Sequence, residues 1–191
     1  MIRVTLGLDG YVSSGAADEY FKMFFPAEGQ REPVLPEVVE GRWVYPEGVP
    51  EPVLRTYTVR RFTPATGEMD VDFVVHAGGV AAPWAMRARP GDRVGVSAAH
   101  GLHRPPREAS WQLVVGDATA LPAIGRIVEE LPAGTSATVY AMSRGARRPA
   151  MGRSSGTPAF RSSTTNSRPA SVTVWRRRIL HSPSRRSNTS T

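Results

Sequence analysis

Near the middle of the chain, Arg55, Tyr57 and Thr58 bring together three side chains that could bind one ligand. They belong to a run bounded by Pro52 and Pro64, which predicts a β-strand. Strand alternation places Arg55 and Tyr57 on one face and Thr58 on the other. A cation beside an aromatic ring, with a hydroxyl nearby, suits a ligand that is both anionic and planar, such as a flavin dinucleotide. Periodicity alone favours a simpler interpretation, an ordinary half-exposed strand.

A segment of small residues, 77–82, follows the next predicted strand and precedes a predicted helix. Small side chains at a helix start leave backbone amides unobstructed, and such amides can hold a pyrophosphate. His76, at the end of the preceding strand, could reach the same ligand, although it could equally be an ordinary strand-end histidine. The segment could also be only a tight connection. We expect Trp84 to pack in the core and fix the angle of the helix.

The composition excludes several classes of site. The 191 residues include no cysteine, which rules out disulfides, thiolate zinc sites and iron–sulfur ligation and leaves cytoplasm as the default location. His100 and His103 have no partners at metal-ligand spacing, so we expect no metal site. No Ser/His/Asp or paired-carboxylate arrangement supports a hydrolase. The N-terminus lacks an apolar signal region, and no apolar run approaches ~18 residues, so neither secretion nor a membrane span is predicted.

The formal net charge of +7 is unevenly distributed. Eleven of the 24 basic residues are arginines between Arg144 and Arg186, whereas none of the 17 acidic residues lies beyond Glu130. The 13 basic residues before Arg144 face all 17 acidic ones, which gives that part a formal charge of −4. The basicity therefore belongs to the C-terminal segment.

The first hundred residues alternate between short strands and turn signals. We predict strands at 2–6, 20–25 and 93–97, a hairpin formed by 55–62 and 70–76, a proline-rich surface excursion over 30–52 and a short helix at 84–88. Short strands at this spacing predict an antiparallel barrel or a sandwich.

A different pattern begins after residue 107. Residues 111–115 read as a buried strand and 138–142 as another. Between them, apolar residues recur at helical spacing, at Leu121, Ile124, Val128 and Leu131, with Thr119 as a plausible N-cap. This order predicts a βαβ unit with a nucleotide-binding edge at the end of its first strand. Asp117 and Thr119 could instead form only the turn and the cap.

Residues 143–191 have no sustained period and are rich in Ser, Thr, Arg and Pro, which predicts disorder. A non-catalytic protein that binds anionic partners through this tail is therefore an alternative. Phe160 and Trp175 are its only aromatic residues, which gives little support to base stacking, and we do not expect nucleic acid as a partner. A gene remnant that does not fold stably is a third possibility.

Three motifs in this order resemble one family. RTYTVRRF, DVDFVVHAGGVAAPWAMRARPGDRVGV and GDATALPAI are similar to motifs of siderophore-interacting proteins, which are FAD-containing, NAD(P)H-dependent ferric-siderophore reductases of the ferredoxin-reductase-like group. The resemblance covers roughly residues 1–142. It implies a β-barrel FAD-binding domain of the FR type over 1–107, followed by an incomplete α/β NAD(P)H-binding domain over 108–142 and a disordered tail over 143–191. It also implies a cytoplasmic, monomeric oxidoreductase that releases iron from ferric siderophores.

The resemblance assigns roles to the candidate residues. Arg55 would pair with the FAD pyrophosphate, Tyr57 would lie against the isoalloxazine ring, and Thr58 would hydrogen-bond near its reactive edge. Asp72 and Phe73 share a cofactor-binding motif with His76, which would reach the ribityl or phosphate region. The remaining candidates are Ala81 and Ala82 at the pyrophosphate, and Asp117, Thr119 and Ala120 at the NAD(P)H edge.

The chain departs from the family pattern at several places. Residues 79–82 are Gly-Val-Ala-Ala where the family usually has Gly-Pro-Ala-Ser, so a hydroxyl is lost at Ala82. Residues 98–101 replace a Gly-Pro-Arg-Gly-like turn. Residues after Met142 resemble no part of the family, so we hypothesise a frameshifted or truncated reading frame. Retranslation of the DNA in its other frames tests this hypothesis.

Overall fold

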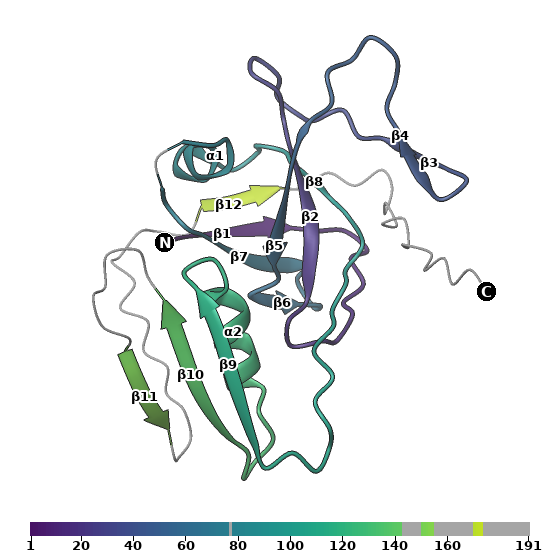
Figure 1. Ribbon diagram of the computed structural model, residues 1–191. Helices are drawn as coiled ribbons and strands as arrows, with labels where there is room; N and C mark the ends of the chain where they lie inside the picture. The colour runs from purple at the N-terminus through teal and green to yellow at the C-terminus, as the bar shows by residue number, and fades with distance from the viewer. Residues whose placement is uncertain (77, 143–149, 155–169, 174–191) are drawn as a thin grey trace, which may run out of the picture.

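The computed structural model of the chain describes residues 1–76, 78–142, 150–154 and 170–173 (Figure 1). An N-terminal part contains β1 (Ile2–Gly7), β2 (Tyr20–Phe25), β3 (Glu37–Val39), β4 (Arg42–Val44), β5 (Val53–Thr58), β6 (Arg61–Thr63), β7 (Glu68–Phe73), α1 (Ala81–Arg87) and β8 (Gly95–Val96). A βαβ unit contains β9 (Trp111–Asp117), α2 (Leu121–Glu129) and β10 (Ser136–Met142). Two strands follow it, β11 (Ala150–Ser154) and β12 (Ala170–Thr173).

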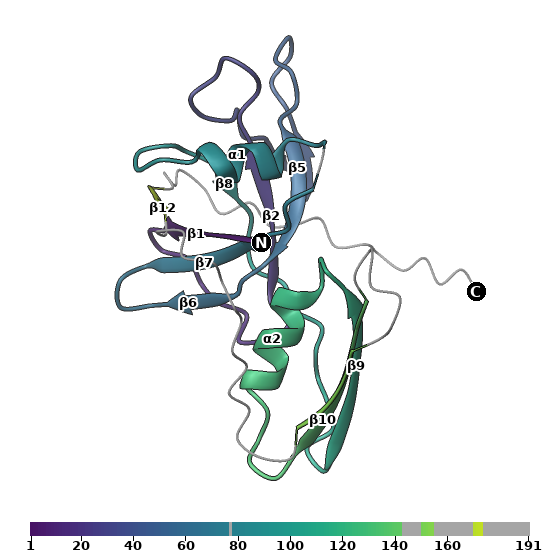
Figure 2. The same ribbon diagram turned by 90° about the vertical axis from the view of Figure 1, so that its left-hand side faces the viewer.

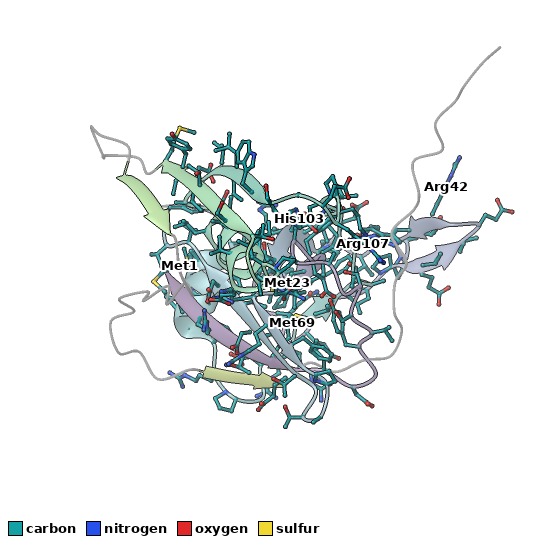
Figure 3. The ribbon with its side chains drawn as sticks, turned by 90° about the horizontal axis from the view of Figure 1, so that it is seen from below. Met1, Met23, Arg42, Met69, His103 and Arg107 are labelled. Atoms are coloured by element: carbon teal, nitrogen blue, oxygen red, sulfur yellow. The ribbon has the colours of Figure 1, made fainter. Side chains whose placement is uncertain are left out.

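Two sheets form the N-terminal part. One has the order β12-β1-β7-β6 and the other the order β5-β2-β8. β1 runs antiparallel to β7, β2 runs antiparallel to β5, and β12 runs parallel to β1. The hairpin β3–β4 stands apart from both sheets within the 30–52 excursion, and Arg42 extends outward from it (Figure 3).

The expected antiparallel barrel is confirmed only in part. The strands are antiparallel and lie in the expected order, but the two sheets are not closed into one cylinder among the described strands. Their strands cross in the two ribbon views (Figures 1 and 2), and the two sheets share one hydrophobic core.

The predicted hairpin of 55–62 with 70–76 is wrong in its first half. β5 pairs with β2, whereas β6 pairs with β7. The chain changes sheets at Val59 and Arg60, because the Val59 amide donates to the Glu19 carbonyl at 2.8 Å while the Arg60 amide donates to the Asp70 carbonyl at 3.0 Å. One residue therefore belongs to each sheet, and we call this two-residue step the crossover.

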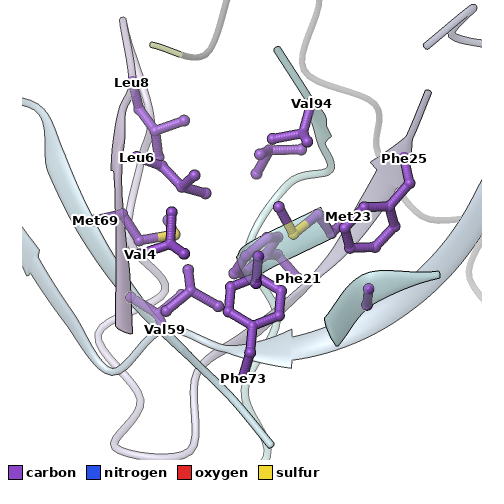
Figure 4. Close-up of a cluster of buried hydrophobic side chains, with 14 of the residues drawn as sticks. Val4, Leu6, Leu8, Phe21, Met23, Phe25, Val59, Met69, Phe73 and Val94 are labelled. Carbon is purple, nitrogen blue, oxygen red and sulfur yellow. The ribbon is translucent and has the colours of Figure 1, made fainter. Parts of the chain in front are cut away.

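The hydrophobic core lies between the two sheets (Figure 4). Val4 and Leu6 of β1 and Phe73 of β7 meet Phe21 and Met23 of β2, and all five side chains are fully buried. Each such side chain contributes about 1.5–3 kcal/mol by leaving water. In these strands, apolar residues at every second position face the core, as the alternation of side chains along a β-strand requires.

Helix α1 is attached to the core through aromatic rings. Trp84 is 9% exposed, and its ring centroid lies 5.4 Å from that of Phe25 and 5.9 Å from that of Phe73. Such pairs add about 0.5–1.5 kcal/mol each beyond simple burial. The expectation that Trp84 packs in the core is confirmed, and its role in fixing the angle of the helix stays a prediction.

The predicted βαβ order is confirmed, but its first strand is not buried as expected, because Trp111, Leu113 and Val115 of β9 are exposed. β9 and β10 are parallel, with Leu113 opposite Thr138, and α2 covers one face of them (Figures 1 and 2). The buried residues of α2 are Pro122, Ile124, Gly125 and Ile127, so the buried face is rotated from the one expected. The N-cap of α2 is Ala120 and not Thr119. Neither described helix is long and apolar enough to cross a membrane.

The segment predicted to be disordered contains β11, antiparallel to β10, and β12. The disorder expected over 143–191 stays a prediction. The rest of 143–191 lies outside the described residues.

Candidate functional site

Strand β5 carries the first group of candidate residues. Its pairing with β2 places Arg55 opposite Met23 and Tyr57 opposite Phe21. On the opposite face, Lys22 Nζ donates to Thr56 Oγ1 at 2.7 Å. The predicted alternation is therefore confirmed: Arg55 and Tyr57 share a face, and Thr58 lies on the other with Thr56.

Tyr57 is half-buried between the strand and the core. Its ring centroid lies 4.5 Å from that of Phe73 and 6.3 Å from that of Phe25. Burial raises the pKa of the Tyr57 phenol to about 12, against an opposing effect of the Arg55 cation. The phenol therefore stays neutral at physiological pH, and it offers a ligand an aromatic face and an O–H donor without a negative charge.

Arg55 is exposed at the surface of the same strand. Its Nη1 atom donates to the Leu54 carbonyl at 2.8 Å, and this bond holds the guanidinium group against the backbone of β5. A guanidinium carries five N–H donors in a planar fork, so this one bond leaves donors for phosphate oxygens.

The small-residue segment leads into α1 as predicted. Gly78 and Gly79 have φ angles of +85° and +80°, a conformation that favours glycine. The N-cap of α1 is Val80, which makes no side-chain cap, and no acidic residue lies in the first turn. The amides of Ala81 and Ala82 are among those that a helix leaves without intrahelical partners, so they are suited to bind an anion.

His76 lies beside this segment. A Cβ atom built on Gly79 would lie 3.6 Å from His76 Cε1, so the exposed imidazole is next to the turn that precedes α1. The structure thus brings His76, Gly79 and the start of α1 together. Through Phe73 and Trp84 it also connects this group to Tyr57.

Asp72 and Phe73 occupy supporting positions. Asp72 accepts two hydrogen bonds from Arg3, at 2.7 and 2.8 Å, and its Oδ2 lies 3.9 Å from Arg60 Nε. Phe73 is fully buried beneath Tyr57. Asp72 is thus paired with two arginines, and Phe73 belongs to the core.

Asp117, Thr119 and Ala120 form a second group at the end of β9. Asp117 Oδ1 accepts from the Thr119 amide at 2.8 Å and from its hydroxyl at 2.6 Å, and the Ala120 amide donates to the Asp117 carbonyl at 3.1 Å. A Cβ atom at Gly116 would lie 2.6 Å from Ala120 Cβ, so only glycine allows this close approach of strand and helix. The simpler interpretation, a turn that leads into a helix, accounts for these contacts. Figures 1 and 2 show that this end of β9 points toward the N-terminal part.

Two ion pairs that were not predicted join the βαβ unit to the N-terminal part. Arg126 of α2 reaches Glu19, and Arg60 of the crossover reaches Glu129 of α2. Sequence spacing offers no signal for these pairs, because 107 and 69 residues separate the partners. The described residues contain no group of three or more His, Asp or Glu that could hold a metal ion.

Comparisons with known proteins agree with the motifs. A family model described as a siderophore-interacting FAD-binding domain matches residues 1–103, and one described as a siderophore-interacting protein matches residues 109–163. The second match passes Met142, so the expectation that nothing beyond Met142 resembles the family is wrong for 143–163.

Two curated relatives have reductase names. An NADPH-dependent ferric-chelate reductase of Escherichia coli strain K12 is 40% identical over 132 residues, which are 68% of this chain and 50% of the relative. A ferric vibriobactin reductase, ViuB, of Vibrio cholerae is 32% identical over 143 residues, 73% of this chain and 52% of the relative. The chain spans about half the length of these relatives.

Solved structures have the same fold. A siderophore utilization protein from T. fusca superposes with a TM-score of 0.63 at 32% identity, covering 92% of this chain and 62% of the other. The siderophore-interacting protein SipS from Aeromonas hydrophila gives a TM-score of 0.56 at 25% identity, covering 91% and 60%. Because one family model matches more than half of the chain, the chain belongs to the siderophore-interacting protein family.

Proposed function

We propose that the chain acts as an oxidoreductase that uses FAD and NAD(P)H to reduce ferric siderophores and release their iron. The family match to an FAD-binding domain and the two relatives named as ferric reductases support this proposal. The observation that carries it is the connection of Arg55 and Tyr57, through buried rings, to a helix start that no side chain caps.

The residues present fit a flavin dinucleotide. An exposed guanidinium and uncapped amides suit a pyrophosphate, and the first turn of α1 holds no carboxylate that would repel it. A neutral, half-buried phenol suits the edge or face of a flavin ring. We assign Arg55, Ala81 and Ala82 to the pyrophosphate and Tyr57 to the ring.

The remaining residues of β5 and β7 have secondary parts. Thr58 offers a hydroxyl next to Tyr57, and His76 offers a donor beside the turn at Gly79. Asp72 acts indirectly, because its pairs with Arg3 and Arg60 hold β7 in register. Phe73 supports the ring of Tyr57 from below.

The chemistry that FAD supplies when bound is to accept two electrons from NAD(P)H and pass them singly to ferric ions. The chain's own residues bind and orient. Arg55 holds the diphosphate, and the Tyr57 hydroxyl keeps its proton and adds no negative charge near the ring. Asp117, Thr119 and Ala120 offer the edge that NAD(P)H would approach, where Gly116 permits close contact between strand and helix.

Iron enters as a substrate, chelated by the siderophore, and leaves as the more weakly chelated ferrous ion. We further propose that the protein is a monomer in the cytoplasm. The alternative of an anion-binding tail concerns residues 143–191, most of which lie outside the described ranges.

The test is to reconstitute the chain with FAD, add NADPH without oxygen, and then add a ferric siderophore together with a ferrous-specific dye. We expect bleaching of the flavin absorbance followed by formation of the ferrous complex. A reconstituted flavin that no nicotinamide bleaches, although dithionite does, contradicts the NAD(P)H step alone. A chain that takes up no FAD contradicts the whole proposal.

A further inference from the structure

Helix α2 contacts the N-terminal part through two ion pairs, and it supplies the cation in one pair and the anion in the other. Arg126 Nη1 donates to Glu19 Oε2 at 3.1 Å, so the helix provides the cation. Three residues further along α2, Glu129 accepts from Arg60, with Nη1 to Oε2 at 2.8 Å, so there the helix provides the anion. Residues three apart lie on one side of a helix. The two pairs therefore fix both the position and the rotation of α2.

Burial ranks the two pairs. The Glu19 side chain is fully buried and that of Arg126 is 12% exposed, whereas Glu129 is 40% exposed. Within the N-terminal part Glu19 accepts from the Tyr11 hydroxyl at 3.0 Å, the Ser13 hydroxyl at 2.7 Å and the Ser14 amide at 2.9 Å, all of them neutral donors. Arg126 is the cation that compensates this buried carboxylate. Water screens the Arg60–Glu129 pair much more strongly.

Both arginines act at the crossover that follows the proposed flavin strand. Arg126 Nη1 also donates to the Val59 carbonyl at 2.9 Å, and Arg60 is the next residue. Val59 comes directly after Thr58, and Tyr57 precedes both. Helix α2 is thus attached to the end of β5, while its own N-terminus follows residues 116–120.

We propose that Arg126 is a positioning residue that holds the βαβ unit at one orientation against the end of β5. Residues 116–120 are thereby kept at a fixed distance from Tyr57 and Thr58. The further claim, that this distance sets how closely a nicotinamide approaches the flavin, rests on the function proposed above. The claim that Arg126 fixes the orientation of the βαβ unit does not depend on that function. Glu130, which accepts from Arg126 Nε at 2.6 Å, holds the guanidinium in the required direction.

The absence of native cysteines allows a direct measurement of this orientation. Ala65, in the turn between β6 and β7, and Ala133, in the loop after α2, are both exposed. In the full chain, both residues are replaced (Ala65→Cys and Ala133→Cys), and each new cysteine carries one spin label. Pulsed electron paramagnetic resonance then gives the distribution of distances between the two labels. We expect one narrow peak. Arg126→Met in this background should remove that peak and leave a broad or split distribution.

Two further variants make the outcome decisive. Arg93→Gln removes an ion pair with Glu32 inside the N-terminal part, and we expect it to leave the peak narrow. If Arg126→Met alone fails to fold, as circular dichroism will show, Arg126→Met combined with Glu19→Gln removes the uncompensated charge together with the contact. We expect this folded double variant to give the broad distribution. A folded variant without Arg126 that keeps the single narrow peak overturns the proposal.

The measurement uses neither FAD nor NADPH, so its failure is distinct from a failure of the proposed function. A second comparison connects the two. In FAD-loaded protein, we expect Arg126→Met to slow bleaching by NADPH while bleaching by dithionite stays unchanged. Equal slowing by both reductants would contradict the role of Arg126 in nicotinamide approach and leave the orientation result standing.

Discussion

Arg126 and Glu19, separated by 107 residues, form an ion pair in which the carboxylate has no exposed surface. The pair joins the βαβ unit to the loop before β2. A buried carboxylate is costly to leave without a cation, because the surrounding protein solvates it poorly. The N-terminal part therefore depends on α2 for its own stability, and the two parts should unfold together.

The first prediction concerns that dependence. We expect Arg126→Met to lower the free energy of unfolding by about 3–5 kcal/mol, the usual cost of removing one partner of a buried pair. Urea unfolding followed by circular dichroism measures it. Arg93→Gln, at a more exposed pair with Glu32, is the matched control and should cost about 0–1 kcal/mol. Equal losses in the two variants would show that burial of Glu19 does not matter.

The second prediction compares two glycines of the βαβ unit. The nearest atoms to a Cβ atom at Gly125 would be those of the Arg60 guanidinium, at 3.5 Å and beyond, which is an ordinary contact. Because alanine favours helix over glycine, Gly125→Ala should raise stability by about 0.5–1 kcal/mol. At Gly116 a Cβ atom would meet Ala120 Cβ at 2.6 Å, so Gly116→Ala should lower stability by about 1–3 kcal/mol. Thermal melting measures both, and the same sign for both would contradict the described packing of α2.

The third prediction concerns FAD affinity. Replacing Arg55 with methionine should raise the dissociation constant for FAD roughly 10- to 100-fold, since a hydrogen bond to a charged group contributes about 1.5–3 kcal/mol. Titration by flavin fluorescence measures it. Arg42→Met, on the outlying β3–β4 hairpin, should leave the affinity unchanged (Figure 3). A similar loss in both variants would indicate that only net charge attracts FAD.

The fourth prediction concerns pH. Tyrosine in the unfolded chain has a pKa of about 10, whereas burial raises that of Tyr57 to about 12. Between these values the folded chain retains a proton that the unfolded chain has lost. The free energy of unfolding should therefore fall as the pH rises from about 10 to about 12.

Tyr57→Phe is the comparison for this titration. It lacks the ionisable group, so its free energy of unfolding should fall less over the same pH range. Difference spectra at alkaline pH identify the phenol that ionises last. Parallel stability curves for the two proteins would show that Tyr57 titrates normally.

Much of the fold could be predicted from local sequence pattern. The aromatic run of β2, the strands β9 and β10 and the periodic apolar residues of α2 predict the type of their elements, because local propensity is strong there. Burial was predicted less well, since Trp111, Leu113 and Val115 of β9 are exposed and the buried face of α2 is rotated. The single strand expected over 55–62 could not be split from sequence, because the change of sheet at Val59 depends on the distant carbonyl of Glu19 and on Asp70. The alternation of side-chain types continues through the crossover, so the sequence gives no sign of a break between two strands.

The candidate site was predictable where a motif places residues close in sequence. Arg55, Tyr57, His76 and the start of α1 occupy positions consistent with those roles, which stay predictions. Asp72 could not be understood from its motif, because its partner Arg3 is 69 residues away. The role of Arg126 could not be predicted for a similar reason. In the sequence of a helix, an arginine that pairs with a buried carboxylate cannot be distinguished from one that is exposed to solvent.

The most direct test of the central claim is a titration of the purified full chain with FAD, followed by flavin fluorescence and visible absorbance. We predict saturable binding of one FAD per chain, with a shifted and structured visible spectrum and a rise in melting temperature. A chain that folds, melts cooperatively and leaves the spectrum and the fluorescence of FAD unchanged would contradict the flavin site at β5 and α1.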